Sequence, residues 1–143
     1  MSTPPADNAS RSTQDVTDDQ EAAERDSLGI LIDDSAGDAV VVHLRGEIDL
    51  LTSPRVGRQV RKITDQAAPG SVVIMDLTGV VFLDSLGITT LLNLHQQASE
   101  ARSSLRLVLE PAQFSRRVLQ LAGVSEVLDI YDSISEARDG RAG

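Results

Sequence analysis

The stretch VVIMDL, residues 72–77, is nearly continuous in apolar side chains. A strand of this composition is typical of the interior of a parallel sheet, where helices cover both faces. Residues 72–77 are therefore predicted to form a central strand, with further strands on either side of it.

Two strands and a helix are predicted before this central strand. Residues 28–32 and 39–44 are apolar, and the polar cluster 33–38 between them favours a hairpin. In the helix that follows, Ser53 is expected to cap the first amides and Pro54 to occupy the first helical position. Its apolar residues recur at helical spacing up to the Pro69-Gly70 stop, and they are Val56, Val60, Ile63 and Ala67.

Helices and strands also alternate after the central strand. A helix is expected from about Ser85, a strand at 105–109 and a strand at 127–131. The helix that begins near Ser85 has an apolar side formed by Ile88, Leu91, Leu92 and Ala98. A helix opened by Pro111 and stopped by Gly123 has one apolar stripe, which consists of Phe114, Val118, Leu121 and Ala122. A short final helix is indicated by the capping box of Ser133 and Glu136.

This order predicts an α/β fold with a mixed, mostly parallel sheet of about five strands, an N-terminal hairpin and about four helices. The domain is expected to span residues 28–137, followed by a short flexible end at 138–143. Residues 1–26 hold seven acids and two arginines, a charge of about −5. Such a segment buries little apolar surface, so residues 1–27 are predicted to be a disordered acidic tail. It is either a solubilising extension, which we favour, or a docking tail.

Composition limits the function. The chain of 143 residues has a formal charge of −9, and only 2% of its residues are aromatic. Binding to nucleic acid or to an anionic membrane is therefore disfavoured. The absence of cysteine excludes thiolate metal sites and disulfides. Neither a signal peptide nor an apolar run long enough to span a bilayer is recognisable, so a cytoplasmic protein is expected.

Two loops are expected to meet at the carboxyl ends of the parallel strands, where open sheets of this kind bind ligands. They are residues 46–54 and 78–87. In the second loop, Ser85 lies where the loop becomes a helix, and the free amides there favour an anion. Gly87 lets the backbone and a partner approach closely. Alternatively, Asp84 or Ser85 is simply the cap of the helix.

An enzyme is the less favoured reading. The surroundings of Ser85 do not match Gly-x-Ser-x-Gly, because Leu83 stands at the first glycine position. His43 and His95 are the only candidate bases; His43 falls in a predicted strand and His95 on a predicted helix, where each is more often a structural residue. No phosphate-binding loop is present, and two histidines with scattered acids make a weak metal site. No catalytic residue, metal or cofactor is therefore predicted.

Two further features remain open. Asp49 either ends a strand before a polar loop or approaches Ser85 and shapes a partner surface. The basic residues of the first helix are a solvated face by default, or they pair with acids of a partner.

Together, residues 44–49 (LRGEID) and 76–88 (DLTGVVFLDSLGI), with Pro111, Phe114, Leu121 and Gly123, resemble the STAS domain of bacterial anti-sigma factor antagonists. The resemblance covers about residues 28–137. It implies that Ser85 accepts phosphate from an anti-sigma factor with a histidine-kinase-like ATPase fold, which itself binds ATP and Mg²⁺. It further implies a partner surface, built from the two loops, that comprises Glu47, Asp49, Thr52, Ser53, Asp84, Ser85, Leu86 and Gly87.

The resemblance also implies a switch. The unphosphorylated protein binds the anti-sigma factor and frees the sigma factor, the phosphorylated protein does not bind, and a serine phosphatase restores binding. Transcription, for example in a stress response, is regulated in this way. The sequence departs from the family at Leu86, where Ser or Thr is frequent. A scaffold or ligand-sensing STAS module that is not phosphorylated is the alternative function.

Overall fold

Five strands form one sheet in the order β1-β2-β3-β4-β5. The computed structural model describes residues 27–35 and 37–140, so the predicted tail lies outside the described residues except for Ser27. Strand β1 pairs antiparallel with β2, and the other neighbours pair in parallel. This confirms the predicted mixed sheet with its hairpin. The strands are β1 (Leu28–Asp33), β2 (Ala39–Ile48), β3 (Val72–Leu83), β4 (Ser104–Val108) and β5 (Asp129–Tyr131).

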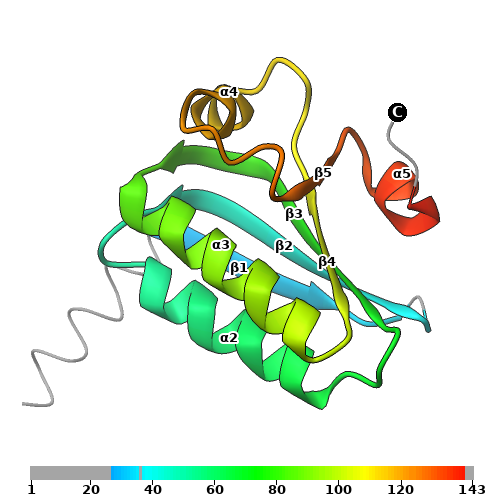
Figure 1. The fold of residues 1–143 in the computed structure, drawn as a ribbon. Helices are drawn as coiled ribbons and strands as arrows, with labels where there is room; N and C mark the ends of the chain where they lie inside the picture. Colours follow the sequence, from blue (N-terminus) through cyan, green and yellow to red (C-terminus); the bar gives the residue numbers. More distant parts are fainter. Residues whose placement is uncertain (1–26, 36, 141–143) are drawn as a thin grey trace, which may run out of the picture.

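Four helices connect and follow these strands in the predicted order: α2 (Ser53–Gln66), α3 (Ser85–Glu100), α4 (Phe114–Leu121) and α5 (Ile134–Asp139). Figure 1 shows α2 and α3 side by side in front of the sheet, with α4 beyond the end of β3 and α5 beside β5. Helix α5 has the predicted cap, because the Glu136 amide donates to Ser133 Oγ at 3.1 Å. It reaches Asp139, so the fold extends past the expected boundary at 137, while residues 141–143 are outside the described part.

Each face of the sheet has its own apolar contacts, because successive side chains of a strand point to opposite faces. Val42 and Leu44 of β2 pack with β3 residues against α2 and α3 in the larger cluster. Val41, which directly precedes Val42 and therefore points the opposite way, packs on the other face with Ala137 of α5. The helices contribute fully buried side chains to the larger cluster, among them Val56, Val60, Leu91 and Leu94.

Strands β2 and β3 are longer than expected. The sequence prediction ended them at Leu44 and Leu77, because Gly46 and Thr78-Gly79 read as the beginning of loops. In the structure the two strands stay paired, through irregular register, as far as Ile48 and Leu83. Gly79 allows this, since a Cβ there would lie 3.1 Å from Cβ and Cγ of Arg45 on the neighbouring strand.

Helix α4 differs most from expectation. It begins at Phe114 rather than Pro111, with Gln113 as the capping residue. Gln113 Nε2 donates to the carbonyl oxygens of Leu77 and Val80, at 2.7 and 3.1 Å. Ser115 Oγ also donates to the Val80 oxygen, at 2.9 Å. These bonds turn Ser115 and Leu119 inward, so the predicted inward stripe is wrong: Phe114 is 66% exposed and Leu121 is 78% exposed.

Candidate functional site

The two predicted loops meet because β2 and β3 end together. Ile48 and Leu83 are paired in parallel register. One residue later the Asp84 amide donates to the Ile48 carbonyl oxygen at 3.2 Å. The loop between β2 and α2 and the start of α3 therefore lie at the same end of the sheet, as expected.

The start of α3 separates the roles of Asp84 and Ser85. Asp84 is the capping residue, and its Oδ1 accepts a hydrogen bond from the Gly87 amide at 2.9 Å. Ser85 is the first helical residue and is exposed. Within the described chain the Ser85 hydroxyl makes no hydrogen bond, so the capping alternative belongs to Asp84. An exposed hydroxyl at this position is accessible to a modifying enzyme.

Gly87 joins the two loops by close packing. A Cβ at Gly87 would lie 2.6 Å from Leu83 Cδ1 and 2.8 Å from the Ile48 carbonyl oxygen. The missing side chain thus lets the first turn of α3 rest directly on the ends of both strands. This packing positions Ser85 directly beyond the ends of β2 and β3.

Asp49 organises its own loop. Its Oδ1 accepts hydrogen bonds from the amides of Leu51 and Thr52, at 3.0 and 3.2 Å. The Thr52 hydroxyl donates to the Glu47 carbonyl oxygen at 2.8 Å and accepts from the Asp49 amide at 2.9 Å. Among the described residues no hydrogen bond joins Asp49 to Ser85, so a direct role of Asp49 at the acceptor stays a prediction.

The predicted partner-binding residues fall into two groups. Thr52, Ser53 and Gly87 are buried and support the loops, so their contact with a partner stays a prediction. Ser53 is also not the cap of α2: Thr52 holds that position, without a capping hydrogen bond from its side chain. The residues left at the surface or partly exposed are Glu47, Asp49, Asp84, Ser85 and Leu86.

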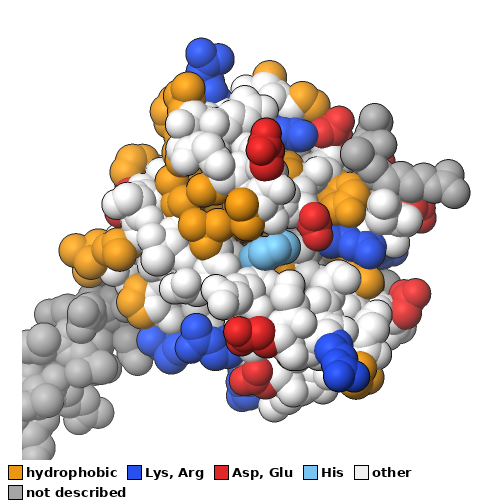
Figure 2. Space-filling model, in the orientation of Figure 1, with side chains coloured by type: hydrophobic (Ala, Val, Ile, Leu, Met, Phe, Trp, Pro, Cys, Tyr) orange, Lys and Arg blue, Asp and Glu red, His pale blue; other side chains and the backbone are white. Residues whose placement is uncertain are grey.

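Exposed apolar side chains surround these loops. Leu50, Leu51, Val81, Phe82, Leu86 and Phe114 are all at least 43% exposed, and we call them the apolar rim. Figure 2 shows hydrophobic side chains gathered at the end of the molecule where α2 and α3 begin, and over α4. A patch of this kind marks an interaction surface. Of these six residues, the sequence analysis named only Leu86 as a partner contact, and it placed Phe114 in the apolar stripe of its helix.

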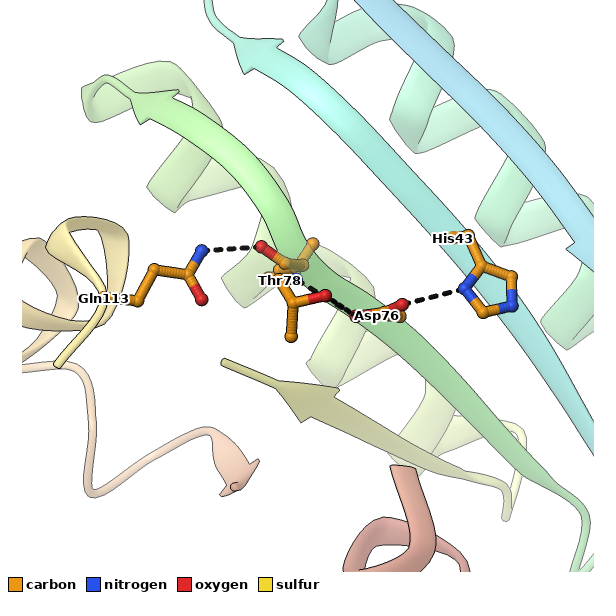
Figure 3. A network of polar contacts seen from close by, with 5 residues as sticks. His43, Asp76, Thr78 and Gln113 are labelled. Carbon is orange, nitrogen blue, oxygen red and sulfur yellow. Dashed lines mark hydrogen bonds and ion pairs between the residues drawn. The ribbon is translucent and has the colours of Figure 1, made fainter. Parts of the chain in front are cut away.

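A second polar cluster lies along β3, away from its end (Figure 3). His43 Nδ1 on β2 and Asp76 Oδ2 on β3 are 2.8 Å apart. The Thr78 hydroxyl and amide donate to Asp76 Oδ1 at 2.7 and 3.0 Å. Burial opposes ionisation of Asp76, but the bonds from Thr78 and then His43 outweigh it and hold the pKa of Asp76 below its ordinary value of 3.8.

Ser85 has no histidine partner within the described chain. Neither His43 nor His95 forms a hydrogen bond with Ser85 there, and residues 27–35 and 37–140 contain no cluster of three metal-ligating side chains. Over the same residues, every helix is too short or too polar to cross a membrane.

Comparison with known proteins identifies a family. The family model of the STAS domain matches residues 32–137. The anti-sigma-B factor antagonist of Listeria monocytogenes is 26% identical over 117 residues, which cover 81% of this chain and 99% of the relative. The family match runs from the end of β1 into α5 and includes both loops described above.

Solved structures share the fold. An anti-sigma factor antagonist from Mycobacterium paratuberculosis superposes with a TM-score of 0.69 at 24% identity, covering 80% of this chain and 94% of the other. The anti-sigma factor antagonist SpoIIAA in its unphosphorylated form gives a TM-score of 0.62 at 19% identity, covering 78% and 95%. SpoIIAA from Bacillus in the phosphorylated form gives 0.58 at 19% identity, covering 78% and 98%.

The packing of Gly87 predicts a position-specific response to an added methyl group. Gly87→Ala should lower the free energy of unfolding by about 1–3 kcal/mol, because the methyl meets a backbone oxygen that cannot move freely. Gly57→Ala in α2 is the matched control, since the nearest atom to its Cβ is 3.8 Å away. It should be neutral or stabilising by up to about 1 kcal/mol. Urea unfolding measures both, and equal effects would contradict the packing argument.

The Asp76 cluster predicts a pH dependence of stability. Because the pKa of Asp76 is lowered on folding, its carboxylate stabilises the fold above the ordinary value of 3.8, and this contribution is lost as pH falls through the folded pKa. Asp76→Asn should therefore be less stable than the parent protein at neutral pH, and the difference should shrink in acid. Urea unfolding at several pH values tests this; a difference that does not change with pH would refute it.

Proposed function

Because this chain belongs to the STAS domain family, we propose that it is an anti-sigma factor antagonist whose docking surface is switched by a phosphate on Ser85. The single observation that carries the proposal is the exposed Ser85 hydroxyl at the first position of α3, left without a hydrogen bond among the described residues while Asp84 caps the helix. Two similarities support it: the Listeria relative is an anti-sigma-B factor antagonist, and SpoIIAA, which shares the fold, exists in an unphosphorylated and a phosphorylated form.

A phosphate on Ser85 would be compatible with the fold. The free amides and partial positive charge of a helix N-terminus stabilise an anion. Ser85 is at the N-terminus of α3, a helix of 16 residues. Phosphorylation adds about −1.5 to −2 charges at neutral pH. The modified domain therefore keeps its structure, and the consequences of the phosphate appear at its surface.

The same phosphate opposes docking. The Asp84 carboxylate is next to Ser85, and exposed apolar side chains of the apolar rim, including Leu86, lie around the loops. A partner packed on this surface would bury a phosphate beside a carboxylate, which costs desolvation and charge repulsion. The unphosphorylated surface is apolar enough to bind, and the phosphorylated one resists burial.

The partners follow from this switch. An anti-sigma factor of the histidine-kinase-like ATPase type supplies ATP and Mg²⁺ and transfers the phosphate to Ser85. A serine phosphatase removes it and restores binding. The protein itself acts by binding rather than by catalysis, in the cytoplasm, and regulates transcription through release of the sigma factor.

Substitution of Ser85 tests the switch. Ser85→Ala should bind the anti-sigma factor whether or not ATP is present, and Ser85→Asp should bind on the order of a hundredfold more weakly, because it places a fixed charge in the interface. Isothermal titration calorimetry measures both affinities, and mass spectrometry locates the phosphate. Ser99→Asp is the matched control, since Ser99 is exposed near the other end of α3. Equal affinities of Ser85→Ala and Ser85→Asp would refute the proposal.

Substitution of Phe114 tests the extent of the docking surface. Phe114→Ala should weaken binding of the same partner about tenfold or more, because large aromatic side chains dominate interface energies. Its stability should change by no more than about 0.5 kcal/mol, since the residue is 66% exposed. Leu31→Ala on β1, at 67% exposure, is the control and should bind normally. Unchanged affinity of Phe114→Ala would remove α4 from the docking surface.

A further inference from the structure

Part of the sheet face opposite α2 and α3 is open in the described structure. Helix α5 contacts β3, β4 and β5, and its Ala137 packs with Ile74 and Val108 on this face. Leu31 of β1, Arg45 of β2 and Thr78 of β3 are exposed instead. This open area adjoins the His43–Asp76 pair and lies along the strands rather than at the Ser85 end.

The open area forms a groove of about 520 Å³. Glycines contribute to it: Gly29 on β1 and Gly79 on β3 both line it. Gly79 allows the stem of Arg45 to lie across β3, at the close approach described above. A cavity of a few hundred Å³, with apolar walls and a few converging polar groups, is the usual form of a small-molecule site.

The polar groups of the groove favour one kind of ligand. Arg45 forms no ion pair with any described residue, and its guanidinium is suited to bind a carboxylate through two parallel hydrogen bonds. Asp76 Oδ2 accepts a hydrogen bond from Nδ1 of His43, so Nε2 of the neutral ring is an acceptor and leaves the ligand carboxylate to Arg45. The carboxylate of Asp76 disfavours a ligand with two negative charges. Leu31, exposed at the wall, offers an apolar surface to a hydrocarbon body.

We propose that this groove binds a small organic monocarboxylate, with Arg45 pairing with the carboxylate, and with Leu31 and the ring of His43 covering its apolar body. Binding here does not require phosphorylation of Ser85. It would give the protein a ligand input of its own, on a surface separate from the proposed docking surface.

Hexanoate is a suitable probe, and hexan-1-ol is its uncharged control. Titration of the full-length, ¹⁵N-labelled protein with hexanoate should give saturable amide shifts at Gly29, Leu31, His43 and Gly79, whereas hexan-1-ol should bind about tenfold more weakly or worse, because it lacks the charge-assisted hydrogen bonds. Arg45→Gln should weaken hexanoate binding about tenfold. Arg58→Gln, an exposed arginine on α2, is the matched control and should bind like the parent protein.

A second variant blocks the groove without removing charge. A Cβ at Gly29 would meet nothing closer than the Arg45 carbonyl oxygen at 3.8 Å, so Gly29→Val fits the strand and fills the groove. It should keep the amide spectrum of a folded protein and lose the hexanoate shifts, while Ser85→Ala should retain them. The proposal is overturned if hexanoate gives no saturable shifts, if hexan-1-ol binds equally well, or if Arg45→Gln and Gly29→Val both bind like the parent.

Discussion

The parallel pairing of β2 and β3 up to Ile48 and Leu83 is the constraint on which the functional end of the molecule depends. It brings two loops that are far apart in sequence to one end of the sheet. Gly87 then packs against both strand ends, and the bond from Asp84 to the Ile48 oxygen closes the junction. If this pairing ended where the hydrophobic run ends, at Leu77, Ser85 would stand on an unsupported loop.

The same strand end also positions the apolar rim. The carbonyl oxygen of Val80 accepts from both Gln113 and Ser115, the two neighbours of Phe114 in sequence. Helix α4 is thereby tied to β3 through its first turn, and Phe114 is directed outward. One backbone oxygen of β3 thus connects the strand that leads to Ser85 with the helix that carries Phe114, the aromatic part of the proposed docking surface.

The two faces of the domain suit two kinds of recognition. The Ser85 end combines exposed apolar side chains with a hydroxyl at a helix N-terminus, which are the features behind the proposed switch of protein binding by added charge. The open sheet face combines an arginine without an ion pair in the described chain with the exposed apolar side chain of Leu31, an arrangement that suits a small organic carboxylate. Both surfaces are built from β2 and β3, so a ligand on one lies on the strands that support the other.

The sequence by itself determined the order of the elements, the hairpin, the final capping box and the place of Ser85 at the start of a helix, because these depend on local periodicity and on residues a few positions apart. Only the tertiary structure decided how far β2 and β3 extend, which face α4 buries and where Asp49, Thr52 and Ser53 point. Those features depend on contacts between distant segments, such as Gln113 with Leu77 and Gly79 with Arg45. The local sequence at Thr78-Gly79 and at Pro111 cannot predict such contacts. There the local preference for a loop or a helix start is outweighed by interactions with distant segments of the chain.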